Sequence, residues 1–142
     1  MSPIATLMLS LAALGGDPPA ADLKALQGTW QVTSMEREGE TVPAEDFKTW
    51  GVRYEGNRVT LMDGDRVHRR GIVTLDSSRK PKAVNTWDGD GPYADQTSPG
   101  IYELEGDTLR LAFAKPGEPR PTAFTTKSGS AVLVVTYKRV KK

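Results

Sequence analysis

Hydrophobic and polar residues alternate with a period of two over much of the chain. The alternation is most regular where Leu109, Leu111 and Phe113 occupy every second position. A Gly-Asp turn separates this segment from a similar one at residues 100–105. A period of two is typical of a strand with one buried and one solvated face, so the two segments predict a β-hairpin.

Six further segments have strand-like composition or alternation, and turns rich in glycine, proline and aspartate separate most of them. The eight predicted strands are residues 29–36, 52–55, 59–62, 66–75, 82–87, 100–105, 108–113 and 131–140. An antiparallel series of eight strands has two unpaired edges, and closing the sheet into a barrel removes both. We therefore predict an all-β fold, an eight-stranded antiparallel barrel whose interior has room for side chains or one small ligand.

Two short helical segments are predicted beside the strands. Asp22 is placed to cap a helical turn ahead of the first strand. Between the first two strands, residues 43–50 begin with a proline and carry acidic residues in the first turn, as a short helix does. Phe47 and Trp50 lie three residues apart, so we expect them on one side of this helix, where they cap one end of the core.

The long strand at residues 66–75 places a charged residue in register with its apolar ones. Arg69 has the inward phase, so its side chain either faces the interior or is turned outward by a local distortion. Gly71, in the middle of the strand, predicts such a bulge or bend. The positions expected to face inward are Val67, Gly71, Val73 and Leu75.

An apolar run at residues 4–14 is followed by glycine, proline and alanine up to residue 21. A run of this length is too short to span a bilayer, which takes ~20 residues, but suits the core of a signal peptide. No Lys or Arg precedes Ile4, and the alternatives are a buried core helix or a misassigned start. We predict a signal peptide and linker at residues 1–21, a barrel domain at 22–142, and export to the periplasm or the extracellular space.

Composition excludes several classes of function. With 19 Lys and Arg against 18 Asp and Glu, the net charge is +1, so no field attracts nucleic acid and no nucleic-acid partner is predicted. Cysteine is absent, which excludes disulfides, thiolate zinc sites and a cysteine nucleophile. With His68 as the one histidine, we predict no metal and no cofactor. No stable membrane span is expected after removal of the leader, and the sequence leaves a protein partner unknown.

The segment around Asp88 and Asp90 is similar to the start of a calcium-binding loop, because alternating aspartates present oxygen ligands to one ion. The remaining positions do not fit. Tyr93 stands where the loop needs glycine, and Pro99 stands where it needs a bidentate glutamate. We interpret the segment as a turn.

The sequence Gly28-Thr29-Trp30 at the start of the first strand resembles the opening motif of the lipocalins. The resemblance implies that Trp30 closes one end of the barrel. It also implies that an arginine late in the last strand, here Arg139, packs across the tryptophan. Gly28, Trp30 and Arg139 are therefore the expected structural residues of the closed end. A second lipocalin motif, Thr-Asp-Tyr, is replaced by Glu-Gly-Asp at residues 105–107.

A closer resemblance is to the short lipocalin-like domains, mostly uncharacterised, that are numerous in planctomycete bacteria. It covers nearly all of the chain after the leader. The family implies a barrel fold, with no agreed function and no known catalytic residues. The resemblance rests on residues 26–30, 43–45, 79–83, 100–109, 116–122, 132–135 and 138–139.

These observations favour a barrel that binds a small, mostly apolar ligand and catalyses no reaction, because barrel mouths are common ligand sites. One alternative is a structural or protein-interaction domain whose barrel is filled by side chains. A more remote alternative is an enzyme, which would need converging polar groups in the interior. The volume left open inside the barrel discriminates between them. The predicted ligand-binding residues are Tyr54, Arg69, Tyr102, Phe113 and Tyr137.

Overall fold

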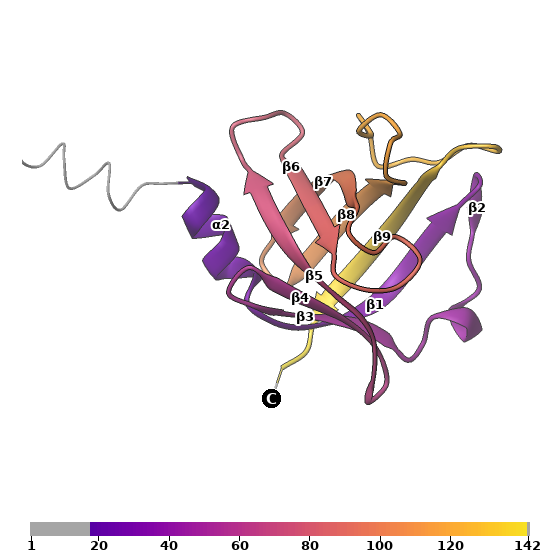
Figure 1. Ribbon diagram of the computed structural model, residues 1–142. Helices are drawn as coiled ribbons and strands as arrows, with labels where there is room; N and C mark the ends of the chain where they lie inside the picture. The colour runs from indigo at the N-terminus through magenta and orange to yellow at the C-terminus, as the bar shows by residue number, and fades with distance from the viewer. Residues whose placement is uncertain (1–17, 142) are drawn as a thin grey trace, which may run out of the picture.

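Eight antiparallel strands form a closed ring in the computed structural model, which describes residues 18–141 (Figure 1). Neighbours in the ring are consecutive strands, apart from the two-residue β2, and the last strand pairs with the first. The predicted eight-stranded antiparallel barrel, lipocalin-like in architecture, is confirmed. The ring strands are β1 (Gly28–Arg37), β3 (Trp50–Glu55), β4 (Arg58–Asp63), β5 (Arg66–Asp76), β6 (Ala83–Asp88), β7 (Thr97–Glu105), β8 (Thr108–Ala114) and β9 (Val132–Arg139).

Closure depends on β1, which pairs with strands on both sides. Its first half pairs with β3, and nearly its whole length pairs with β9, from Trp30 opposite Arg139 to Arg37 opposite Leu133. The far end of β1 also pairs with the short β2 (Glu40–Thr41), which lies outside the ring. Closing the ring in this way satisfies the backbone groups that an open sheet would leave unpaired at its edges.

Helix α2 (Pro18–Leu26) covers one end of the barrel, opposite the end where β2 and the 115–131 loop lie (Figure 1). It begins four residues before Asp22, so the expectation that Asp22 caps the helix is wrong. The carboxylate of Asp22 instead accepts a hydrogen bond of 2.6 Å from the Tyr102 hydroxyl and pairs with Lys82 at 3.0 Å. These contacts attach the helix to the barrel wall.

The helix between the first two strands is shorter than the predicted 43–50. A single turn, η1 (Ala44–Asp46), forms through bonds between residues three apart. Trp50 then begins β3, because its backbone pairs with Asp63 of β4 and the preceding Thr49 carbonyl accepts a bond from Gly64. Phe47 is buried in the main core and Trp50 packs against it.

Gly71 lies in a regular part of β5, and the bulge predicted there is displaced. The register shift lies between Leu61 and Met62, which oppose Arg69 and Val67. Beyond this shift Val67 is turned outward and 44% exposed, so its predicted inward position is wrong. At Gly71 a Cβ atom would lie 2.3 Å from the Trp87 carbonyl oxygen, so glycine is needed there because the β6 backbone comes so close.

The main core runs from Leu26 of α2 to Val42 beside β2, and its most deeply buried large side chains include Trp30, Tyr102 and Leu109. A second, smaller cluster lies on the outer wall, where Phe124 of the 115–131 loop packs against Ile101 and its neighbours. This loop is therefore attached to the barrel. Arg120 holds it there by donating hydrogen bonds to the carbonyl oxygens of Val84 and Gly100 and to the Asn85 side chain.

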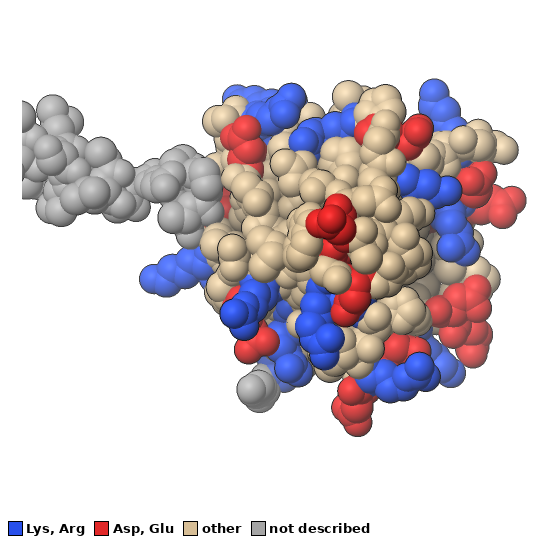
Figure 2. Space-filling model, viewed as in Figure 1, with Lys and Arg blue, Asp and Glu red and all other residues tan. Residues whose placement is uncertain are grey.

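Charges of both signs are interspersed over the face seen in Figure 2, and neither forms a continuous patch there. This distribution agrees with the net charge of +1. Within residues 18–141, no helix is long and apolar enough to cross a bilayer.

Candidate functional site

The barrel is sealed at the end covered by α2. Trp30 has no exposed surface, and its Nε1 donates a 2.8 Å hydrogen bond to the carbonyl oxygen of Leu26. The Arg139 guanidinium lies 4.3 Å from the centre of the indole ring and donates to the backbone oxygens of Ala25 and Gln27. The predicted barrel-end residues are thus brought together, so any ligand must enter from the opposite end.

Gly28 contributes to this seal through its backbone. Its φ is +112°, in the region that favours glycine, and it lets the chain turn from α2 into β1. A Cβ atom at this position would meet Arg139 Nη1 at an ordinary 3.6 Å, so backbone conformation is the main requirement.

A pocket of about 360 Å³ opens at the opposite end, between the end of β1, the loop after β6 and the start of β9. Below it lies an inner cavity of about 70 Å³, lined mainly by β3, β4 and β5. We call them the mouth pocket and the inner cavity. They share four wall residues, so they form one site with two levels. The shared residues are Arg69, Thr86, Asp88 and Phe113.

Four of the five residues predicted to contact a ligand line this site. Tyr54 and Tyr137 line the inner cavity, while Arg69 and Phe113 line both levels. Tyr102 does not line it, because its side chain is buried at the sealed end with its hydroxyl bonded to Asp22 of α2. Alternation alone could not place Tyr102 along the barrel axis.

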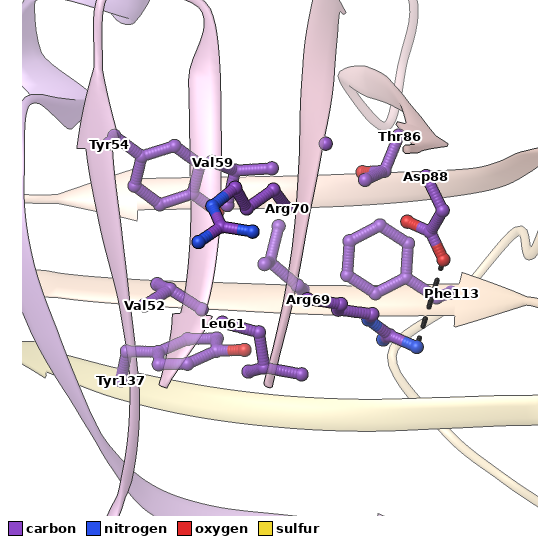
Figure 3. A pocket seen from close by; sticks show the side chains of 12 residues that line it. Val52, Tyr54, Val59, Leu61, Arg69, Arg70, Thr86, Asp88, Phe113 and Tyr137 are labelled. Atoms are coloured by element: carbon purple, nitrogen blue, oxygen red, sulfur yellow. Dashed lines mark ion pairs between the residues drawn. The ribbon is translucent and has the colours of Figure 1, made fainter. Parts of the chain in front are cut away.

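The inner cavity has an apolar side and a polar side. Figure 3 shows Val52, Tyr54 and Tyr137 on one side and Asp88 with Thr86 on the other, with Arg69 reaching toward Asp88. Burial raises the pKa of the Tyr54 and Tyr137 phenols, so both stay protonated even at an alkaline pH where an exposed tyrosine ionises. The apolar side can contact a hydrocarbon or aromatic body, while the polar side can fix its orientation.

Asp88 is the buried charged residue of this site, with 5% of its surface exposed. Its carboxylate pairs with the Arg69 guanidinium at 3.7 Å, which exceeds a hydrogen-bond distance. Burial raises the pKa of the Asp88 carboxyl, the Arg69 charge opposes this increase, and the nearby Asp90 adds to it. A buried carboxyl with a raised pKa in a pocket is characteristic of functional sites.

Thr86 precedes Asp88 by two residues on β6 and therefore faces the same side of the sheet. Its hydroxyl oxygen is buried and has no hydrogen-bond partner among the described residues. A buried hydroxyl without a partner is destabilising, unless a bound molecule supplies the bond.

Gly71 makes this arrangement possible, because it opposes Asp88 in the β5–β6 register. The position of a Cβ atom at Gly71 lies 3.5 Å from Asp88 Oδ1 as well as very close to the Trp87 carbonyl. A larger residue would displace β6 and the carboxylate with it. Asp88 and Thr86 were not among the predicted site residues, although their spacing of two on one strand was an available signal.

The two aspartates of the calcium-like segment point to different arginines. Asp88 pairs with Arg69, whereas Asp90 pairs with Arg70 at 3.5 Å and accepts a 2.8 Å bond from its backbone N–H. Within residues 18–141, no group of three or more acidic or histidine side chains is placed to share an ion. The segment forms bends and turns from Gly89 onward, as interpreted, whereas Asp88 is the buried last residue of β6.

Comparisons with models of protein families, with curated proteins and with solved structures found no match. The geometry of the two-level site and the architecture of the barrel are therefore the basis for a functional proposal.

Proposed function

We propose that this protein is an exported lipocalin-like binding protein that holds a small, mostly apolar ligand at the barrel mouth and catalyses no reaction. The observation that carries the proposal is the mouth pocket of about 360 Å³ leading into the inner cavity. Ligand pockets typically measure ~300–1,000 Å³ and combine apolar walls with a few polar groups. The site has both properties.

The apolar side of the inner cavity supports binding of a molecule with an apolar body. The inner cavity offers the rings of Tyr54, Tyr137 and Phe113, each of which contributes a large apolar contact area. Its volume admits only the tip of a ligand, so the rest of the body would lie in the mouth pocket. We also propose membership of the planctomycete lipocalin-like domains, which the contact between Trp30 and Arg139 supports.

Binding can be tested with an environment-sensitive apolar dye. We expect saturable one-site binding to the purified protein, and we expect protein from its native host to release a stoichiometric small molecule into organic solvent. Ala131 lines the mouth pocket, so the ring introduced by Ala131→Trp should occupy space that the dye needs and weaken dye binding by about tenfold or more.

Ala123→Trp is the matched control, because Ala123 is exposed on the same loop and does not line the mouth pocket. It should bind the dye as the parent does. Equal weakening by both variants, or no saturable binding by the parent, would overturn the proposal.

A domain that recognises another protein is the second candidate. It is favoured by the small inner cavity, because side chains fill most of the barrel below the mouth, and by Trp87, which is 40% exposed on the outer wall. A parent protein that binds no dye and releases no small molecule would favour this candidate.

Export is a separate prediction, based on the apolar run at residues 4–14, which lies outside the described residues. We expect mass spectrometry of protein from its native host to find a mature start between Gly16 and Asp22. Removal of residues up to 21 would keep the contacts of Asp22 with Tyr102 and Lys82. Intact Met1 on soluble cytoplasmic protein would contradict export.

A further inference from the structure

Arg69 and Asp88 place opposite charges side by side where the mouth pocket meets the inner cavity (Figure 3). They are too far apart for a hydrogen bond, and neither side chain makes one to another described residue. The Arg69 side chain is 33% exposed and that of Asp88 only 6%. The pair therefore presents unused donors on one group and unused acceptors on the other.

The Thr86 hydroxyl lines the same two spaces. It can donate one hydrogen bond and accept others, and it has no partner among residues 18–141. The shared wall of the site thus contains a donor group, an acceptor group and a hydroxyl capable of both.

From this juxtaposition we infer that the site recognises a neutral head group that both accepts and donates hydrogen bonds, such as a primary amide, on an apolar ligand. The inference rests on the proposed binding function. Arg69 donates to the carbonyl oxygen of the head, and the N–H of the head donates to Asp88. The Thr86 hydroxyl bonds to whichever group of the head lies beside it.

A charged head gains less from the same site. A carboxylate is attracted by Arg69 but repelled by Asp88, and an ammonium group experiences the reverse. Either ion also loses its hydration on entry, which costs more than desolvation of an amide. At the rim, Arg37, Glu38 and Lys115 carry both signs, and solvent screens them more than the inner pair.

The state of Asp88 agrees with this reading. Burial raises the pKa of its carboxyl, because the charged form lacks the hydrogen bonds that water would supply. A ligand N–H supplies one without adding charge. A ligand carboxylate would instead bring a second negative charge beside it.

Three eight-carbon compounds with the same chain separate these cases: octanamide, octanoate and octylamine. Each is titrated at neutral pH against the full protein carrying the apolar dye. The amide can form hydrogen bonds to both Arg69 and Asp88, whereas each charged compound is attracted by only one of them. We expect octanamide to displace the dye at concentrations about tenfold lower than either charged compound, because one additional hydrogen bond to a charged group contributes at least this factor.

Two variants change the charge balance in opposite directions. Asp88→Asn leaves Arg69 without its counter-charge, so the preference for octanamide over octanoate should fall by about tenfold or reverse. Arg69→Gln leaves Asp88 alone and should shift the preference toward octylamine by a similar factor. Arg53→Gln is the matched control, because Arg53 is exposed on β3 and lines neither space, and it should keep the preferences of the parent.

Parent protein that prefers octanoate or octylamine to octanamide would overturn the inference, as would preferences unchanged in both variants. If Asp88→Asn does not fold, Arg69→Gln with octylamine decides alone. In all these cases dye binding by the parent upholds the proposed function. Failure of the dye and of all three compounds to bind the parent would overturn the proposed function as well.

Discussion

Replacing Trp30 by alanine is expected to lower the free energy of unfolding by about 3–5 kcal/mol, the usual cost of removing a large buried aromatic side chain. Trp30 has no exposed surface, so the substitution leaves a cavity under α2. The Leu26 carbonyl also loses its indole donor, and Arg139 loses a cation–π contact worth roughly 0.5–2 kcal/mol. Domains of this kind have a total stability of ~5–15 kcal/mol, so the variant should be close to unfolding.

Urea unfolding of the parent and the variant measures this difference. Trp87→Ala is the matched control, because Trp87 is 40% exposed and its indole bonds only to Asp95 on the surface. It should change stability by less than about 1 kcal/mol. If the two alanine variants unfold at the same urea concentration, Trp30 does not close the barrel.

The second large effect is a loss of stability at alkaline pH. Burial raises the pKa of Tyr54 and of Tyr137 above the ordinary value of 10.0. Each phenol is then still protonated in the folded state at a pH where the unfolded chain has lost the proton. Because the unfolded state binds fewer protons, stability is unaffected below pH ~10 and falls as the pH rises above it.

The slope is ~1.4 kcal/mol per pH unit for each tyrosine, so the two together should remove roughly 3 kcal/mol by pH 11. Denaturant unfolding at pH 8 and at pH 11 measures the loss. In a Tyr54→Phe/Tyr137→Phe variant the loss should be smaller by about this amount. The contributions of lysine and arginine are the same in parent and variant. An equal loss in both proteins would mean that these phenols ionise inside the folded barrel.

Alternation and strand-like composition, together with the turn residues between segments, predicted all eight strands, because one face of each strand is buried against a common interior. The ends of the strands were less predictable. The strand predicted at 100–105 begins at Thr97 and includes Pro99, a residue that normally interrupts a sheet. Pro99 is tolerated because it pairs only with Asn85 of β6, and the pairing of β7 with β8 starts at Gly100. Such one-sided pairing is a property of the assembled barrel.

The two-level site was predictable only in part, for the same reason. Tyr54, Phe113 and Tyr137 followed from their inward phase on regular strands. Asp88 was not predicted to line the site, because its spacing of two from Asp90 suggested a turn. Its burial also depends on Gly71 of the adjacent strand, which has no side chain. The position of Tyr102 at the sealed end depends on where α2 docks, which no local pattern encodes.

The pairing of β9 with β1 also limits how another protein could bind this one. Many recognition domains accept a partner peptide as an extra strand along an open sheet edge. In the part of the chain that the structure describes, no ring strand has an edge that is open along its whole length. One-sided pairing is confined to short stretches, such as residues 66–69 of β5 and 97–99 of β7, and β2 outside the ring is only two residues long. While the ring stays closed, a partner strand could extend the sheet only over a few residues. A partner, if the barrel has one, is therefore expected to contact mainly side chains on the outer wall or at the rim.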